Sequence, residues 1–181
     1  PVLLAAVTDS HLDVDAHARA VDDARQGACV TFVGTVRNHD PEADGEVVAL
    51  DYTAHPSAAA TLREVAEAVV TQLDPDGETR VAVTHRIGRV AVGESAIVAA
   101  VSSPHRALAF TVCGELVDRI KHDVPLWKQQ HLRDGSAVWC GRMTPDKAPH
   151  LAIEAARIAQ VPLTLFGPVE DRAYWDGIVV P

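Results

Sequence analysis

Lysine is rare in this chain, and two of its three lysines, Lys121 and Lys128, lie in one short stretch, KHDVPLWK. The remaining basic side chains include thirteen arginines. A lysine ammonium is a compact charge that can lose its proton when desolvated, whereas an arginine guanidinium keeps its charge. Two lysines held around Pro125 and Trp127 therefore predict a site that binds an anion or transfers a proton. The alternative is two flexible residues on a solvated surface.

A second candidate site is the predicted helix start at SSPHRA, residues 102–107. The first backbone N–H groups of a helix have no partner within the helix, and they lie at the positive end of its dipole. His105 and Arg106 add positive charge there, which disfavours the helix but suits a bound anion. The alternative is an ordinary cap whose side chains point to solvent.

A third candidate is GTVRNHD, residues 34–40, where Arg37 and His39 follow an apolar strand. An arginine at this place can hold a phosphate or carboxylate through two parallel hydrogen bonds. It can equally be a plain boundary residue.

Composition and known motifs exclude several function classes. A net charge of −9 argues against general binding to nucleic acid or to an anionic membrane, because both need a basic face. The sequence contains no Walker loop, GxGxxG, HExxH or GxSxG motif and no His/Cys cluster with metal-ligand spacing. The N-terminal stretch has no basic leader, and its apolar run is too short to span a bilayer. We expect a soluble cytoplasmic protein without a bound metal.

The three cysteines are far apart in the sequence, and they predict neither a disulfide framework nor a metal knuckle. Cys29 and Cys113 lie in apolar surroundings, so we expect both to be small core residues.

The elements that must position these residues follow from apolar periodicity and turn residues. Strands are expected at residues 2–7, 28–37, 46–54, 81–88, 95–103 and 136–140, and helices at 12–24, at 56–73 and from Pro104 onward. The strands at 81–88 and 95–103 are expected to form a hairpin. The sequence thus predicts an α+β fold with a mainly antiparallel sheet and helices on one face.

The helix that begins near Pro104 matters most for the site. Ser102 or Ser103 is expected to cap it, and Pro125 is expected to end it, since the residue before a proline disfavours the α region. Its buried face is expected to carry Ala109, Cys113, Leu116, Val117 and Ile120.

Residues 1–141 are expected to form the main domain, and residues 142–181 a C-terminal extension. The extension is expected to contain a linker, one short helix at HLAIEAARIAQ and an irregular tail.

Helix length sets a geometric constraint on the candidate residues. Arg106 and Lys121 are fifteen residues apart on one predicted helix, which is roughly 22 Å at ~1.5 Å per residue. One small ligand cannot touch both residues of a single chain. Either they serve separate sites, or a two-fold dimer brings one chain's helix start to the other chain's lysines.

Three patches together resemble the large, catalytic subunit of molybdopterin synthase. The patches are GACVTFVGTVRNHD, then HRIGRVAVGE with SSPHRALAF, then KHDVPLWKQQ, and the resemblance covers about residues 25–141. It implies an α/β-hammerhead type of fold, a homodimer, and a heterotetramer with a small ubiquitin-like partner whose C-terminal Gly-Gly carries a thiocarboxylate. The implied activity is sulfur transfer from that partner to cyclic pyranopterin monophosphate, which gives the dithiolene of molybdopterin.

The resemblance also implies roles for particular residues, with no cofactor and no metal. Lys121 and Lys128 match the two pocket lysines of the family, which have catalytic and substrate-binding roles. Lys121 is implied to lie beside the partner's terminal glycine, and Lys128 to aid substrate binding and proton transfer. These two roles can be exchanged. The other residues implied to bind or line the substrate pocket are Arg37, His105, Arg106, Thr35, Val36, Gln129 and Gln130.

The chain departs from the family pattern at a few places, and two other functions stay open. Thr35 stands where some relatives carry a basic residue, and Gln129-Gln130 replaces a more charged pair. One alternative is an enzyme that uses Lys121 or Lys128 as a Schiff-base lysine, although no phosphate-cradling glycine loop is present. The other is a non-catalytic dimeric module that docks a ubiquitin-like partner.

Overall fold

The computed structural model describes residues 1–39 and 45–180, and the chain forms two compact units that interleave in sequence. The first unit comprises Pro1–Thr35, Ala54–Ile87 and Ser95–Leu126. The second unit comprises Val36–Thr53, Gly88–Glu94 and Trp127–Pro181.

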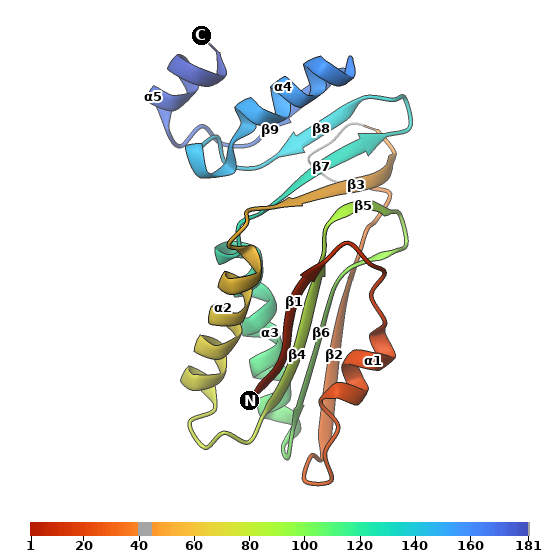
Figure 1. Ribbon diagram of the computed structural model, residues 1–181, viewed down its shortest axis with the longest axis vertical. Helices are drawn as coiled ribbons and strands as arrows, with labels where there is room; N and C mark the ends of the chain where they lie inside the picture. Colours follow the sequence, from red (N-terminus) through yellow and green to blue (C-terminus); the bar gives the residue numbers. More distant parts are fainter. Residues whose placement is uncertain (40–44, 181) are drawn as a thin grey trace. The chain divides into compact units, whose positions relative to one another are not determined.

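A four-stranded sheet forms the centre of the first unit (Figure 1). Its strands, in spatial order, are β1 (Val2–Thr8), β4 (Arg80–Arg86), β6 (Ser95–Ser103) and β2 (Ala28–Thr35). β1 pairs with β4 in parallel, while β4 and β2 both pair with β6 in antiparallel fashion. The predicted pairing of the strands near 81–88 and 95–103 is therefore confirmed.

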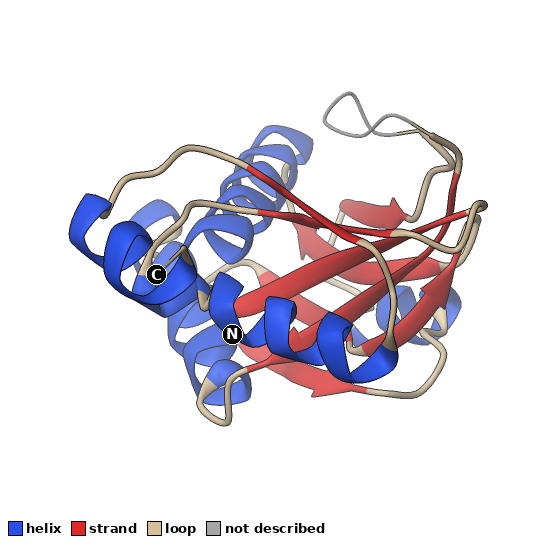
Figure 2. Ribbon diagram, turned by 90° about the horizontal axis from the view of Figure 1, so that it is seen from above, coloured by secondary structure: helices blue, strands red, loops and turns tan. Residues whose placement is uncertain are grey.

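Helices pack on both faces of this sheet (Figure 2). α2 (Ala58–Leu73) and α3 (Arg106–Asp123) cover one face, where they form a continuous apolar core with strand residues such as Val81 and Val83. Because side chains alternate along a strand, Ala82 points to the other face, where it packs against Val21 at the end of the α1 segment. α1 spans Val14–Ala20.

The second unit contains a five-stranded sheet with the order β5 (Gly88–Ala91), β3 (Val47–Ala54), β7 (Leu126–Leu132), β8 (Ala137–Cys140) and β9 (Leu163–Phe166). Its helical segments are η1 (Pro145–Lys147), α4 (Pro149–Ala159), α5 (Arg172–Tyr174) and η2 (Trp175–Val179). Val47, Leu132 and Val138 form a small core between its strands.

The predicted α+β class is confirmed, and the structure refines it in three ways. The described residues form two sheets rather than one, and α1 lies on the opposite face from α2 and α3. Three described strands, β5, β7 and β9, were not predicted. The loop expected after Arg37 lies largely outside the described residues.

The first predicted helix is shorter than the sequence suggested. It was expected over residues 12–24 but ends at Ala20. Asp13 caps its start by accepting a hydrogen bond from the Ala16 N–H at 2.9 Å. The chain then leaves the helix because Asp23 accepts hydrogen bonds from the backbone and side chain of Arg25, a local turn that competes with helical bonding.

The irregular tail predicted after residue 161 is wrong in part. β9 pairs in parallel with β8, and its Leu163 and Leu165 are half-buried. A short apolar run, LTLF, is enough to add a strand where a neighbouring edge is available. The predicted helix in this region is confirmed as α4. The boundary between residues 141 and 142 stays a prediction.

The prediction that Cys29 is a core residue is wrong, whereas that for Cys113 is confirmed. β2 is an edge strand in which Val30 and Phe32 pack against the core, so Cys29 alternates onto the other face and is exposed. Burial raises the pKa of the Cys113 thiol.

No helix among the described residues is long and apolar enough to cross a membrane.

Asp74, at the C-terminal end of α2, holds the turn into β4. Its buried carboxylate accepts hydrogen bonds from the Thr79 hydroxyl at 2.6 Å, the Thr79 N–H at 2.7 Å and the Glu78 N–H at 3.0 Å. Desolvation alone would raise its pKa, but these hydrogen bonds outweigh that effect and lower it. A lowered folded-state pKa means that the stabilisation is present above the unfolded pKa and is lost as the pH falls through the folded value.

We therefore expect Asp74→Asn to lower the free energy of unfolding at pH 7 by about 1.5–3 kcal/mol, the range for hydrogen bonds to a charged group. The difference from wild type should shrink once the pH falls below about 3.9, the unfolded pKa of Asp. Urea denaturation at several pH values measures both effects. Asp76→Asn, in the same turn but exposed, is the control, and an equal loss in both variants would contradict the role given to Asp74.

Candidate functional site

α3 is one continuous helix of 18 residues and carries candidate residues at both ends. The predicted apolar face is confirmed, since the side chains at its three- and four-residue spacing are buried against α2 and the sheet. The helix ends where predicted: Val124, before Pro125, is extended with φ −77° and ψ 126°.

The start of α3 differs from the prediction. The N-cap is His105, in an extended conformation, rather than Ser102 or Ser103. Both serines are used elsewhere: the Ser102 hydroxyl donates to the Val21 carbonyl at 2.6 Å, and the Ser103 hydroxyl accepts from the His105 N–H at 3.3 Å. Among the described residues, no N-cap side chain accepts a hydrogen bond from the first turn of α3.

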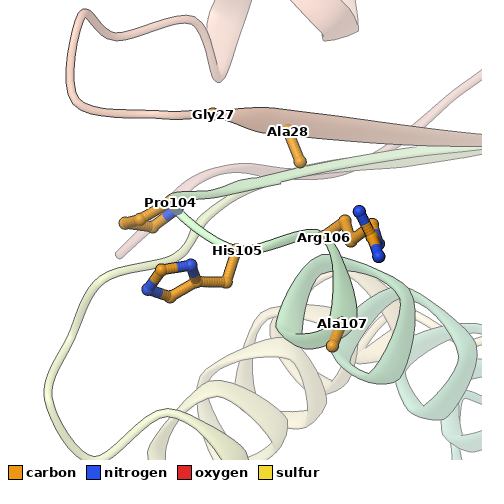
Figure 3. A pocket seen from close by; sticks show the side chains of 6 residues that line it. All are labelled: Gly27, Ala28, Pro104, His105, Arg106 and Ala107. Atoms are coloured by element: carbon orange, nitrogen blue, oxygen red, sulfur yellow. The ribbon is translucent and has the colours of Figure 1, made fainter.

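A hollow of about 440 Å³ opens at this helix start (Figure 3). It is lined from two segments of the first unit, Gly27–Ala28 at the start of β2 and Pro104–Ala107 at the start of α3. His105 and Arg106 are exposed, and Figure 3 places both side chains at the hollow. The helix dipole and the guanidinium give it a positive potential, so the arrangement suits a phosphate or carboxylate.

Lys121 lies at the other end of α3, in the last turn with His122. It is exposed, and its Nζ lies 5.8 Å from the centroid of the Phe32 ring on β2, an attractive cation–π contact. A cation is also favourable against the negative end of the helix dipole. Two independent interactions thus favour a positive charge at this position.

Pro125 and Trp127, which lie between the two lysines, are found at the start of a strand. β7 begins at Leu126 and contains Trp127 and half-buried Lys128. Trp127 donates its indole N–H to the Asp146 carbonyl at 3.1 Å, and the Pro125 carbonyl accepts from the His55 N–H at 3.1 Å. Hydrogen bonds therefore hold the Pro125 backbone and the Trp127 side chain, the two neighbours of Leu126.

Gln129 and Gln130 follow on β7 and differ in exposure. Gln129 is half-buried and lies opposite Trp139 in the β7–β8 pairing. Gln130 is 0% exposed, and its Nε2 donates to the Cys140 sulfur at 3.4 Å. The Gln130 side chain thus faces the interior of the second unit; its pocket-lining role stays a prediction.

The residues at the end of β2 and directly after it also differ in exposure. Thr35 and Arg37 are exposed, whereas Val36 is 3% exposed and is held by backbone hydrogen bonds to Glu94 and Gly93. The alternation places Thr35 and Arg37 on a surface and Val36 in the interior.

The structure brings together only some of the predicted residues. His105 and Arg106 share one hollow, while Lys121 of the same chain lies at the far end of an unbroken helix. Lys128, Gln129 and Arg37 belong to the second unit. The sequence did not predict that Gly27 and Ala28 line the hollow, and no local pattern marks either residue as part of it.

Among the residues that the structure describes, no group of three or more His, Cys, Asp or Glu side chains is placed to hold a metal ion.

The chain is similar to known proteins in sequence and fold. The family described as MoaE protein matches residues 7–123. The molybdopterin synthase catalytic subunit of Nostoc sp. (strain PCC 7120) is 38% identical over 136 residues, which are 74% of this chain and 79% of that protein. Among solved structures, molybdopterin synthase from Staphylococcus aureus has a TM-score of 0.67 at 29% identity, covering 75% of this chain and 95% of that one. A complex of subunits 1 and 2 of molybdopterin-converting factor from Helicobacter pylori shares the fold, with a TM-score of 0.55 at 20% identity over 74% of this chain and 87% of that one.

The hollow at the start of α3 predicts measurable anion binding. We expect Arg106→Gln to weaken the binding of inorganic phosphate by about tenfold or more, because a hydrogen bond to a charged group contributes about 1.5–3 kcal/mol. Phosphate titration followed by backbone amide NMR signals of residues 105–108 measures this. Arg63→Gln, on the exposed side of α2, is the matched loss of one positive charge, and equal affinities in the two variants would show that only net charge matters.

Proposed function

The chain belongs to the MoaE protein family, and on that premise we infer that it is the catalytic subunit of a molybdopterin synthase, a sulfurtransferase of molybdenum cofactor biosynthesis. The sequence match carries this inference, since it spans residues 7–123 and so includes His105, Arg106 and Lys121. Lys128, Gln129 and Gln130 lie beyond the residues of the family match.

We propose that the chain works with a small ubiquitin-like subunit whose C-terminal thiocarboxylate supplies the sulfur. The Helicobacter pylori structure is a complex of subunits 1 and 2 of the corresponding factor, which supports a two-subunit enzyme. We further propose that the enzyme is a cytoplasmic heterotetramer built on a homodimer of this chain.

The homodimer is proposed because of α3. An unbroken helix separates Arg106 from Lys121 by roughly 22 Å at ~1.5 Å per residue. A substrate of pterin size cannot bridge that distance within one chain, but a two-fold axis can place the helix start of one chain beside the lysines of the other.

The proposed substrate, cyclic pyranopterin monophosphate, carries a phosphate that the α3 start would bind. His105 and Arg106 would hold its oxygens together with first-turn N–H groups of the helix. Arg37, with Thr35 and Val36 in the same segment, is proposed as a further substrate-binding element.

The lysines would serve the transfer of sulfur. When the thiocarboxylate reacts, negative charge develops on an oxygen, and a nearby ammonium stabilises it. Opening the cyclic phosphate requires a proton for the departing oxygen, which an ammonium can donate. We propose Lys121 beside the partner's terminal glycine and Lys128 beside the substrate, with no cofactor or metal of the chain's own.

The role of Lys121 is tested by a change that keeps its charge. We expect Lys121→Arg to lower kcat for molybdopterin formation by about 100-fold, the lower range for losing one group that stabilises a developing oxyanion, because the broad planar guanidinium does not take the place of the compact ammonium. The assay combines the purified chain, thiocarboxylated small subunit and cyclic pyranopterin monophosphate.

Lys147→Arg is the control, since it makes the same change at the third lysine of the chain. Full activity in Lys121→Arg would mean that position 121 needs only a charge. A wild-type chain that binds the small subunit but forms no product would favour the docking-module alternative.

A further inference from the structure

Gly27 makes an unusually close approach to the loop that begins α3. A Cβ atom placed on Gly27 would lie 2.7 Å from the Pro104 carbonyl oxygen, well inside van der Waals contact. The Gly27 N–H donates to the Ser103 carbonyl at 3.2 Å, which holds the two backbones together. Gly27 is not among the glycines with positive φ, so the constraint on this position is space rather than backbone conformation.

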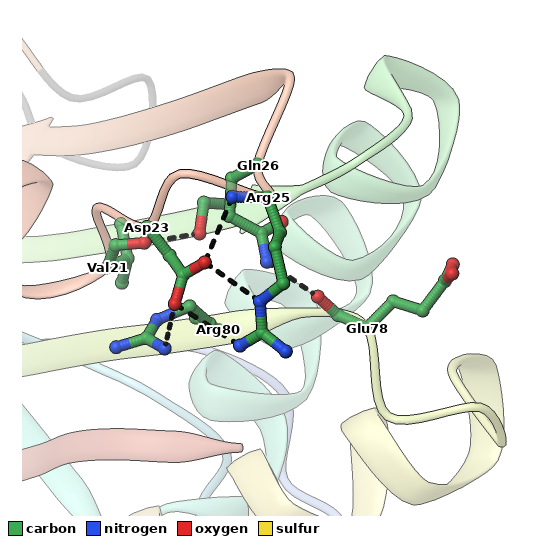
Figure 4. Close-up of polar contacts among 7 residues, drawn as sticks. Val21, Asp23, Arg25, Gln26, Glu78 and Arg80 are labelled. Carbon is green, nitrogen blue, oxygen red and sulfur yellow. Dashed lines mark hydrogen bonds and ion pairs between the residues drawn. The ribbon is translucent and has the colours of Figure 1, made fainter.

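The segment that carries Gly27 is fixed to the sheet by polar contacts along its length (Figure 4). At its start, the Val21 carbonyl accepts a hydrogen bond from the buried Ser102 hydroxyl at 2.6 Å. In the middle, Asp23 pairs with Arg80 of β4 at 2.9 Å. At its end, the Gln26 side chain donates to the Glu78 carbonyl at 3.0 Å.

These contacts leave Gly27 little freedom to move away from Pro104. Asp23 also accepts a hydrogen bond from Arg25, and mainly this bond lowers the Asp23 pKa to about 2. The carboxylate is therefore charged at neutral pH, and it ties the segment to Arg80 under the conditions in which an enzyme works.

The close approach sets the shape of the hollow. Gly27 and Ala28 form one side of it and residues Pro104–Ala107 form the other, so the distance between the two backbones decides where the first turn of α3 lies. The next residues along the chain from Pro104 are His105 and Arg106, and any displacement of the Pro104 peptide is passed to both.

We propose that Gly27 is a positioning residue for the anion pocket: its missing side chain lets the clamped segment, residues 21–28, close against Pro104 and so sets the position of His105 and Arg106. The proposal rests on the proposed function, because it takes these two residues to bind the substrate phosphate. It adds a residue that touches no substrate and acts through the α3 start.

Gly27→Ala is expected to separate the two backbones, since a carbonyl oxygen of the main chain cannot yield as a flexible side chain can. The phosphate-binding groups then move relative to the rest of the site. We expect KM for cyclic pyranopterin monophosphate to rise by about tenfold, the loss in binding expected when one hydrogen bond to the charged phosphate is weakened. The kcat at saturation should change less than twofold, because Lys121 lies at the opposite end of α3.

Gly114→Ala is the matched control. Gly114 lies within α3 itself, and a Cβ there would meet no atom within 4 Å. It therefore makes the same substitution in the helix that begins at the pocket, without the close approach, and it should keep the wild-type KM and kcat. Melting temperatures of all variants monitor the fold.

The experiment has two readouts, steady-state kinetics of the assembled enzyme and the titration of the His105 ring NMR signals with inorganic phosphate. A raised KM with retained kcat, together with weaker phosphate binding in Gly27→Ala only, supports the proposal. Wild-type values of KM and phosphate affinity in a folded Gly27→Ala chain overturn it.

A second variant keeps the proposal testable should Gly27→Ala fail to fold. Asp23→Asn retains the shape of the side chain but removes the charge that pairs with Arg80, so the clamped segment is loosened without a clash. A raised KM with unchanged kcat supports the proposal, and unchanged values of both overturn it.

The phosphate titration distinguishes a failure of the proposed function from a failure of the proposed positioning role of Gly27. A wild-type enzyme that forms no molybdopterin overturns the proposed function. If its His105 signals nevertheless respond to phosphate, and Gly27→Ala alone weakens the response, the positioning role of Gly27 still stands.

Discussion

The length of α3 is the constraint on which the rest of the account depends. Its 18 residues, Arg106–Asp123, run without a break between the caps at His105 and Val124, and the fixed rise of an α-helix keeps its two ends roughly 25 Å apart. The same helix therefore offers two opposite electrostatic environments, a positive end that suits an anion and a negative end that suits a cation. Its buried face, packed against α2 and the sheet, prevents any bending that would bring the ends together.

The choice of basic residue at each end agrees with this division. Arg106, at the end that suits an anion, has a planar fork that matches phosphate geometry and does not release its proton. Lys121, at the other end, is a compact cation held over the Phe32 ring. The chain carries a net charge of −9, so the proposed binding of an anionic substrate would depend on such local arrangements rather than on the overall field.

Much of the fold could be predicted from the sequence because its strongest patterns are local. The apolar periodicity of α2 and α3, the break at Pro125 and the β-branched run before Arg37 each identified an element. The errors arose where tertiary neighbours decide. Cys29 was predicted to be a core residue because the sequence does not show that β2 is an edge strand. β7 was missed because apolar and polar residues do not alternate clearly in LWKQQHL.

The candidate site shows the same division between local and tertiary information. The positive charge at His105 and Arg106 could be predicted from the residue types and from the predicted start of a helix. The contribution of Gly27 could not be predicted, since it depends on the missing space for a side chain: an added Cβ atom would lie 2.7 Å from a carbonyl oxygen nearly eighty residues away. That Val36 and Gln130 face the interior could not be predicted either, because the family pattern names segments, whereas the alternation of a strand decides which side chains face outward; their pocket-lining role stays a prediction.

The central claim, that one active site takes its phosphate-binding residues and its lysine from different chains, is tested most directly by a heterodimer. A chain carrying Lys121→Ala and a chain carrying Arg106→Ala, each with its own affinity tag, would be purified as a mixed dimer and assayed with the thiocarboxylated small subunit. If the sites are shared, one of the two sites is intact, and the mixed dimer should regain about half of the wild-type activity, although each homodimer is inactive. A mixed dimer that is as inactive as both parents would contradict the claim.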